Sequence, residues 1–165
     1  GNISVKQVTN ALVYNNIPES NRFNAQLVGL DWVGTTELVT NGNFATDIND
    51  WTASVATPLA WDSGSIEIET SSSGRGAWQA FTTVVGATYL ATGYSIIAST
   101  AHLLRVGSGS TADSGIADSA ETSVPAKHSV IFAAISATSY VYMRNTDIGT
   151  VNWDNISVKR ILEAP

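Results

Sequence analysis

Alternating apolar and polar residues recur along the chain and predict β-strands. Residues 65–69 read Ser-Ile-Glu-Ile-Glu, which places Ile66 and Ile68 on one side and two glutamates on the other. Such alternation is typical of a strand that buries one face. Similar patterns predict strands over residues 1–9, 37–39, 78–85, 88–98, 102–106, 127–135, 140–144 and 151–161.

Turn signals separate these strands, and little of the chain has a helical period. Asn41-Gly42 predicts a turn, Gly86 ends a strand, and the small residues of 107–121 predict a loop. Short strands at regular spacing, with little helix, favour an all-β fold. We expect an antiparallel β-sandwich of the jelly-roll type.

The pentapeptide Asn-Ile-Ser-Val-Lys occurs twice, at residues 2–6 and at residues 155–159. Because the second copy lies in the last predicted strand, we interpret residues 1–36 as a strand from a preceding repeat plus a connector. Residues 37–165 then form the domain itself. The strand at 2–8 is expected to pair with an open sheet edge, within the chain or between subunits. Tandem β-modules more often build or bind than catalyse.

Composition narrows the class of partner. The net charge is −6 and the eight Lys and Arg residues are scattered, which argues against nucleic-acid binding. No apolar run approaches the roughly 20 residues of a membrane span, so membrane insertion is not expected. The chain has no cysteine, which excludes disulfides and thiolate metal sites. A surface of small polar residues suits an extracellular or virion-borne β-protein.

Three motifs resemble the carbohydrate-binding-module jelly rolls of the galactose-binding-like type. They are Glu-Leu-Val-Thr-Asn-Gly-Asn-Phe at 37–44 with Trp51 after it, Gly-Ala-Thr-Tyr-Leu at 86–90, and Trp-Asp-Asn-Ile-Ser-Val at 153–158. The resemblance covers residues 37–161. It implies a jelly roll that binds carbohydrate. Tandem copies with this composition look most like modules of bacteriophage tail fibres, and similar modules are appended to bacterial polysaccharide hydrolases.

Asp154 is a candidate calcium ligand. Ile156 and Val158 must face the core, so strict alternation places Asp154 on the same inward face. A carboxylate there is costly unless it is paired or bound to a hard cation such as Ca²⁺. In the modules that the chain resembles, a structural calcium ties the first strand to the last. Carried over, its ligands are Asn43, Thr46 and Asp154. Relatives often carry an acidic residue at this turn, and the neutral residues here weaken calcium binding. Alternatively, Asp154 caps backbone N–H groups.

Aromatic side chains supply a candidate glycan site. Trp and Tyr rings stack on the C–H faces of sugars and keep a polar edge for hydroxyl groups. We predict a platform of Trp78, Tyr94, Arg105 and Tyr142. The alternative is that these rings fill the core or a subunit contact, where large aromatics are most often buried.

Catalytic motifs are not evident. Glu67 and Glu69 share a strand face, but the isoleucines between and before them take the core, which places both acids on the solvated side. His102 and His128 are isolated in sequence and lack metal-ligand neighbours at useful spacing. We therefore expect no enzyme activity, and a hydrolase that uses the two glutamates is the weakest hypothesis.

Two binding roles remain open. The first is a structural and binding module of a phage virion appendage, which assembles with itself, as a trimer or another oligomer, and meets a host-surface glycan. The alternative is a monomeric carbohydrate-binding module of a secreted bacterial polysaccharide-degrading enzyme.

Overall fold

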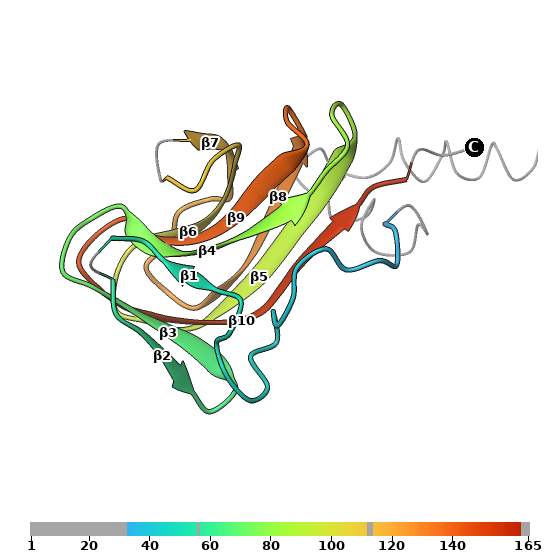
Figure 1. The fold of residues 1–165 in the computed structure, drawn as a ribbon. Coiled ribbons are helices and arrows are strands. Elements are labelled where there is room, and N and C mark those ends of the chain that lie inside the picture. Colours follow the sequence, from blue (N-terminus) through green and yellow to red (C-terminus); the bar gives the residue numbers. More distant parts are fainter. Residues whose placement is uncertain (1–32, 56, 112–113, 163–165) are drawn as a thin grey trace, which may run out of the picture. The chain divides into compact units, whose positions relative to one another are not determined.

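The chain folds as two antiparallel β-sheets of five strands each (Figure 1). The computed structural model describes residues 33–55, 57–111 and 114–162. The strand order is β1-β4-β9-β6-β7 in the first sheet and β2-β3-β10-β5-β8 in the second. The strands are β1 (Thr52–Ala53), β2 (Leu59–Asp62), β3 (Ser65–Thr70), β4 (Arg75–Thr82), β5 (Thr88–Ala98), β6 (His102–Gly107), β7 (Gly115–Asp118), β8 (Ala126–Ala133), β9 (Thr138–Asn145) and β10 (Gly149–Arg160). The predicted all-β antiparallel jelly-roll sandwich is confirmed.

A compact unit spans Gly34–Leu162. The predicted strand at 2–8 and most of the predicted connector lie outside the described residues, so the division at residue 37 stays a prediction. Among the described residues, no helix is long and apolar enough to cross a membrane.

The core lies between the two sheets and is built mainly from alternate residues of the longer strands. Ile66 and Ile68 of β3 are fully buried, as their alternation predicted. Val141 and Met143 of β9, in the other sheet, are fully buried as well. Burying each such side chain stabilises the fold by roughly 1.5–3 kcal/mol. Each sheet therefore keeps a second face that is turned away from the core.

The first described segment runs beside the last strand (Figure 1). The Leu38 N–H donates to the Val158 carbonyl at 3.0 Å, and the Ile156 N–H donates to the Gly42 carbonyl at 2.8 Å. The segment at 37–39 is not part of a regular strand, although it was predicted as one. Its hydrogen bonds nevertheless confirm that the opening and closing segments of the domain are neighbours.

Three strands were missed by the sequence pattern. The first, β1, has only two residues, and both are exposed, so it carries no apolar signal. The Leu-Ala-Trp-Asp sequence of β2 does not alternate, because this strand lies at a sheet edge. The predicted loop at 107–121 contains β7, an edge strand of small residues without a buried side chain.

A bulge in β10 overturns the predicted orientation of Asp154. The register with β5 shifts between Asp154 and Ser157, and Asn155 adopts a left-handed φ of 52°. Asn tolerates this conformation better than most residues do. The extra residue changes the phase of the alternation, so that Trp153 and Ile156 both face the core. Asp154 therefore does not share the inward face of Ile156, and the parity prediction was wrong.

Candidate functional site

Three of the four predicted platform residues form a row across one sheet. Trp78 of β4 lies opposite Tyr142 of β9, and Tyr142 lies opposite Arg105 of β6. Their side chains point away from the core, because the neighbouring residue on each strand is fully buried in it. These neighbours are Ala77, Met143 and Leu104. The row therefore lies on the outward face of the β1-β4-β9-β6-β7 sheet.

Tyr94 does not belong to this row. It lies on β5 of the other sheet and is 39% exposed. The Lys127 ammonium lies 5.6 Å from the centre of its ring, which is within the range of a cation–π contact. The four predicted residues therefore do not form one platform, because the sequence did not show which sheet each strand would join.

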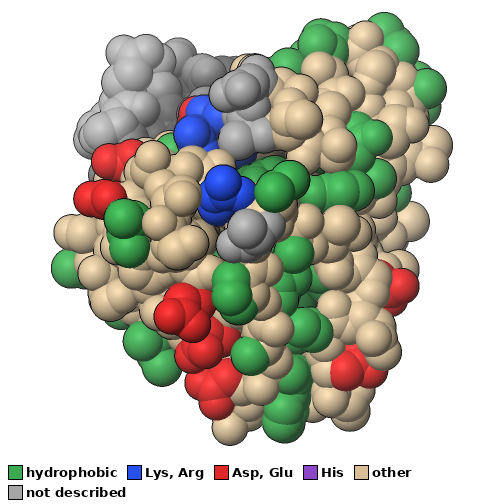
Figure 2. All heavy atoms as spheres, turned by 60° about the vertical axis from the view of Figure 1, so that its left-hand side comes forward, with side chains coloured by type: hydrophobic (Ala, Val, Ile, Leu, Met, Phe, Trp, Pro, Cys, Tyr) green, Lys and Arg blue, Asp and Glu red, His purple; other side chains and the backbone are tan. Residues whose placement is uncertain are grey.

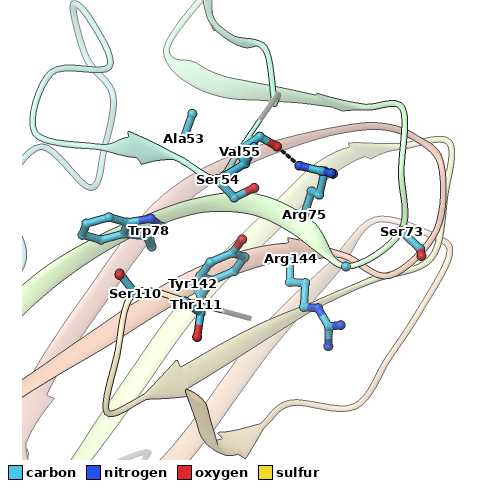
Figure 3. A pocket seen from close by; sticks show the side chains of 11 residues that line it. Ala53, Ser54, Val55, Ser73, Arg75, Trp78, Ser110, Thr111, Tyr142 and Arg144 are labelled. Carbon is cyan, nitrogen blue, oxygen red and sulfur yellow. Dashed lines mark hydrogen bonds between the residues drawn. The ribbon is translucent and has the colours of Figure 1, made fainter. Parts of the chain in front are cut away.

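Trp78 and Tyr142 of this row border a hollow of about 540 Å³ (Figure 3). Its walls include residues 53–55 at the end of β1, the turn before β4 and the loop at 110–111. Figure 3 shows Trp78 at one end, Tyr142 in the middle, and Arg75 and Arg144 at the other end. A volume of this size falls within the range of small-ligand sites.

Tyr142 forms the covered floor of the hollow. It is only 2% exposed although it points away from the core. Burial raises the pKa of the phenol, and a hydrogen bond with Ser54 and the positive charges of Arg144, Arg75 and Arg105 partly offset this effect. Three guanidinium groups therefore favour the ionised form of this one phenol.

Trp78 supplies the accessible ring. Its side chain is partly exposed, and the Tyr140 ring meets it edge-on at a centroid distance of 5.5 Å and an angle of 66°, which fixes the indole plane. Trp51 and Trp153 are buried in the core, as a structural role requires. Trp61 is 46% exposed, but it lies on β2 of the other sheet.

Arg75 and Arg144 were not part of the predicted platform. Arg144 follows Tyr142 by two residues on β9, so the strand period carried a signal for it. It also borders a second hollow of about 550 Å³, together with Arg105 and Asp118. The Arg105 guanidinium donates to both carboxylate oxygens of Asp118, at 2.6 and 2.5 Å. Figure 2 shows basic side chains on this side of the molecule next to hydrophobic ones.

The three residues predicted to bind calcium, Asn43, Thr46 and Asp154, differ in their surroundings. Asn43 and Thr46 are exposed. The two carboxylate oxygens of Asp154 accept hydrogen bonds from the backbone N–H and the side-chain amide of Asn155, at 2.6 and 2.7 Å. No group of three or more acidic, histidine or cysteine side chains able to hold a metal ion occurs in the described part of the chain. In this arrangement Asn155 donates to both oxygens of Asp154, and the calcium ion stays a prediction.

The two histidines, which the sequence analysis treated as isolated, meet between the sheets. Their ring centres are 5.2 Å apart, and both rings lie against Trp153. The Nδ1 atom of His102 donates to the Thr100 carbonyl at 2.8 Å, so its Nε2 accepts from the Ser95 hydroxyl at 2.8 Å. Burial lowers the pKa of both imidazoles, that of His128 to about 4. This buried pair is a structural element rather than a ligand site.

This chain resembles known proteins in its fold and not in its sequence. The sequence matches no protein-family model and no curated protein sequence. A similar solved structure is the CBM22-1 xylan-binding domain of Xyn10C from Paenibacillus barcinonensis, with a TM-score of 0.56 and 14% identity over 74% of this chain and 94% of that one. The CBM22-1–GH10 modules of endo-1,4-β-D-xylanase 10B from Clostridium thermocellum, complexed with xylohexaose, give a TM-score of 0.56 and 13% identity over 79% of this chain and 29% of that one.

A phage protein shares the same fold. The enzymatically active domain of tailspike protein 4 from bacteriophage CBA120 gives a TM-score of 0.51 and 12% identity over 76% of this chain and 21% of that one. At such low sequence identity, the structural likeness is evidence for the fold alone. The chain therefore has the β-sandwich fold of the carbohydrate-binding modules that its sequence motifs resemble.

Proposed function

We propose that the chain is a non-catalytic carbohydrate-binding module whose site is the hollow beside Trp78. The observation that carries this proposal is the row Trp78–Tyr142–Arg105 on the outward face of one sheet. A partly exposed indole offers a flat apolar surface to a sugar ring, and the guanidinium groups near it donate hydrogen bonds to sugar oxygens. The likeness to xylan-binding domains supports polysaccharides as the ligand class.

The position of the carboxylates supports the absence of catalysis. Glycoside hydrolysis needs two carboxyl groups on either side of one bond. Glu67 and Glu69 lie on β3 of the other sheet, away from the hollow. Among the described residues that border the two hollows, Asp118 is the single acid, and it is paired with Arg105.

The experiment is affinity electrophoresis of the 165-residue chain through gels that contain soluble polysaccharides. We expect at least one plant or bacterial polysaccharide to retard the protein, with xylan as the first probe. Trp78→Ala should abolish the retardation, because it removes the stacking surface. Tyr94→Ala is the matched control, since it removes an exposed ring from the opposite sheet. Unchanged retardation of the Trp78 variant, or loss in the Tyr94 variant alone, would overturn the proposed site.

Tyr142 needs a conservative variant. Because it is almost fully buried, Tyr142→Ala would leave a cavity and confuse lost binding with lost folding. Tyr142→Phe keeps the ring and removes the hydroxyl that bonds to Ser54. We expect it to bind more weakly while it retains the wild-type circular dichroism spectrum.

For the setting of the module, we propose a phage virion appendage in which the chain assembles with copies of itself. The repeated pentapeptide, the low charge content and the likeness to a tailspike support it. The second candidate is a module of a secreted polysaccharide-degrading enzyme, which the xylanase modules support equally. Light scattering on the purified chain separates them, because the first setting predicts a stable oligomer and the second a monomer.

A further inference from the structure

We propose that the hollow selects acidic glycans, whose sugars carry a carboxylate or another anionic group. This inference rests on the proposed carbohydrate-binding function and names its ligand class. The anionic group would lie against Arg75 and Arg144, while the sugar ring stacks on Trp78 at the other end of the hollow (Figure 3).

The distribution of charge is the first argument. The chain carries a net charge of −6 and has five arginines. Three of the five, Arg75, Arg105 and Arg144, border the two neighbouring hollows. The described residues that line these hollows include one acid, Asp118. The site is therefore locally positive in a protein that is negative as a whole, and its field attracts anions.

The partners of these arginines are the second argument. Arg105 forms a bidentate ion pair with Asp118, which offsets its positive charge. Arg75 donates to the backbone carbonyl of Val55, which is a neutral acceptor. Within the described residues, no carboxylate forms an ion pair with Arg75 or Arg144. Among the residues that the structure describes, two of the three positive charges therefore have no carboxylate partner.

Arg144 has a hydrogen-bond donor that a ligand could satisfy. Its Nε donor is buried and has no acceptor within the described part of the chain. A buried donor without an acceptor is unfavourable, and a bound acceptor would relieve that cost. Arg144 borders both hollows, so a ligand in either one can reach its guanidinium group.

Two glycines leave room for these guanidinium groups. A Cβ atom at Gly74 would lie 2.9 Å from an Nη atom of Arg144, and one at Gly115 would lie 2.8 Å from the Nε of Arg105. A larger residue at either position would displace the arginine side chain beside it. The two glycines therefore leave space for Arg144 and Arg105 at the border of the hollows.

The chemistry favours an anion over a hydroxyl group. A guanidinium group presents a planar fork of donors that matches carboxylate, sulfate and phosphate oxygens, and such charge-assisted bonds are about twice as strong as neutral ones. Tyr142 is shielded from water, so the difference in strength between a charge-assisted and a neutral hydrogen bond is larger near it than at an open surface.

The test compares glycans that differ only in charge. Binding of the full chain is measured by calorimetry to polygalacturonate and to its fully methyl-esterified form, and separately to dextran sulfate and to dextran. We expect the acidic member of at least one pair to bind about tenfold more tightly, which corresponds to one charge-assisted contact. A preference in the first pair alone identifies a carboxylate ligand, and one in the second pair alone a sulfate-like ligand.

Variants locate the preference. Arg144→Gln and Arg75→Gln should lose most of the preference for the acidic member, with a much smaller loss of affinity for the neutral one. Arg144→Lys, which retains the charge, should keep part of the preference. Arg160→Gln is the matched control, because it removes the same charge from β10 in the other sheet. Circular dichroism establishes that each variant is folded.

The outcomes separate this inference from the proposed function. Equal affinity for both members of both pairs, with loss of binding in Trp78→Ala, would overturn the acidic selection and leave the carbohydrate site intact. An equal loss in Arg160→Gln and Arg144→Gln would show general charge attraction and overturn it as well. If Trp78→Ala binds every glycan as the wild type does, the proposed site itself fails.

Discussion

The carboxylate of Glu37 accepts a hydrogen bond from the backbone N–H of Val158 at 2.7 Å. The two residues are 121 positions apart. A second bond, from the Ser157 hydroxyl at 2.6 Å, adds to the same contact. One side chain of the opening segment thus joins it to the closing strand, a connection for which the sequence resemblance suggested an ion at Asn43, Thr46 and Asp154.

Removing this carboxylate should loosen the join between the two ends of the domain. We expect Glu37→Ala to lower the free energy of unfolding by about 1 kcal/mol, because the side chain is exposed and its hydrogen bonds compete with water. Urea denaturation measures the change. Glu69→Ala, which removes an exposed acid from β3, serves as the control. Equal effects of the two substitutions would contradict the special role of Glu37.

A side chain at Gly42 should be more damaging. A Cβ atom there would lie 2.0 Å from the carbonyl oxygen of Ile156, which is far inside contact distance. We expect Gly42→Ala to cost more than about 2 kcal/mol, since backbone must move. Gly64→Ala is a useful comparison, because open space surrounds it and it suffers only from its φ of +93°. Denaturation curves that rank Gly64→Ala as the worse variant would argue against this contact.

The buried histidine pair predicts a loss of stability in mild acid. The pKa of His128 falls to about 4 in the folded chain, mainly through burial and secondly through the charge of His102, from an ordinary value of 6.5. Between these values the unfolded chain binds more protons. Stability is therefore complete above about pH 6.5 and falls by up to about 3 kcal/mol as the pH drops toward 4.

Melting curves at about pH 7 and about pH 5 test this effect, because ordinary carboxylates remain largely ionised in that range. His128→Gln, which keeps hydrogen-bonding atoms for Ser119 but cannot become charged, should lose most of the pH dependence. Its overall stability is expected to fall, since the Trp153 contact changes. A wild type that melts at the same temperature at both pH values would refute the burial argument.

Calcium also has a direct test. An ion bound at Asp154 in the folded chain alone would raise the melting temperature in millimolar calcium and lower it in EDTA. Such an ion would first have to release Asp154 from Asn155. Asp154→Asn should remove the response if that carboxylate is a ligand. If neither calcium nor EDTA changes the melting temperature, the prediction of a bound calcium ion is wrong.

Strand existence was more predictable than strand partners. Apolar residues recur over 88–98 between two turn signals, and β5 has these same bounds. The alternation of β10 also predicted a strand, yet one bulged residue, Asn155, reversed the orientation of Asp154. Bulges depend on the pairing of two distant strands, so a single local pattern does not reveal them.

The candidate site was predicted in part for the same reason. Trp78, Arg105 and Tyr142 were chosen by residue type, and strand pairing then brought them together. Tyr94 has equally suitable chemistry but belongs to the other sheet. Arg75 lies at the start of a strand after a flexible-looking loop, and nothing in its local sequence connects it with Tyr142.

The contact between Gly34 and Arg160, whose N–H and carbonyl groups meet at 2.7 Å, has a mechanical consequence. Polypeptide that enters the sandwich at one of these residues leaves it beside the other. Tension along the chain would therefore open this seam one hydrogen bond at a time, as a zipper opens, instead of shearing many bonds at once. Because the two residues are adjacent, a force that pulls the flanking segments apart acts first on the hydrogen bonds between the opening segment and β10. The strands of the two sheets bear the force only after those bonds have broken.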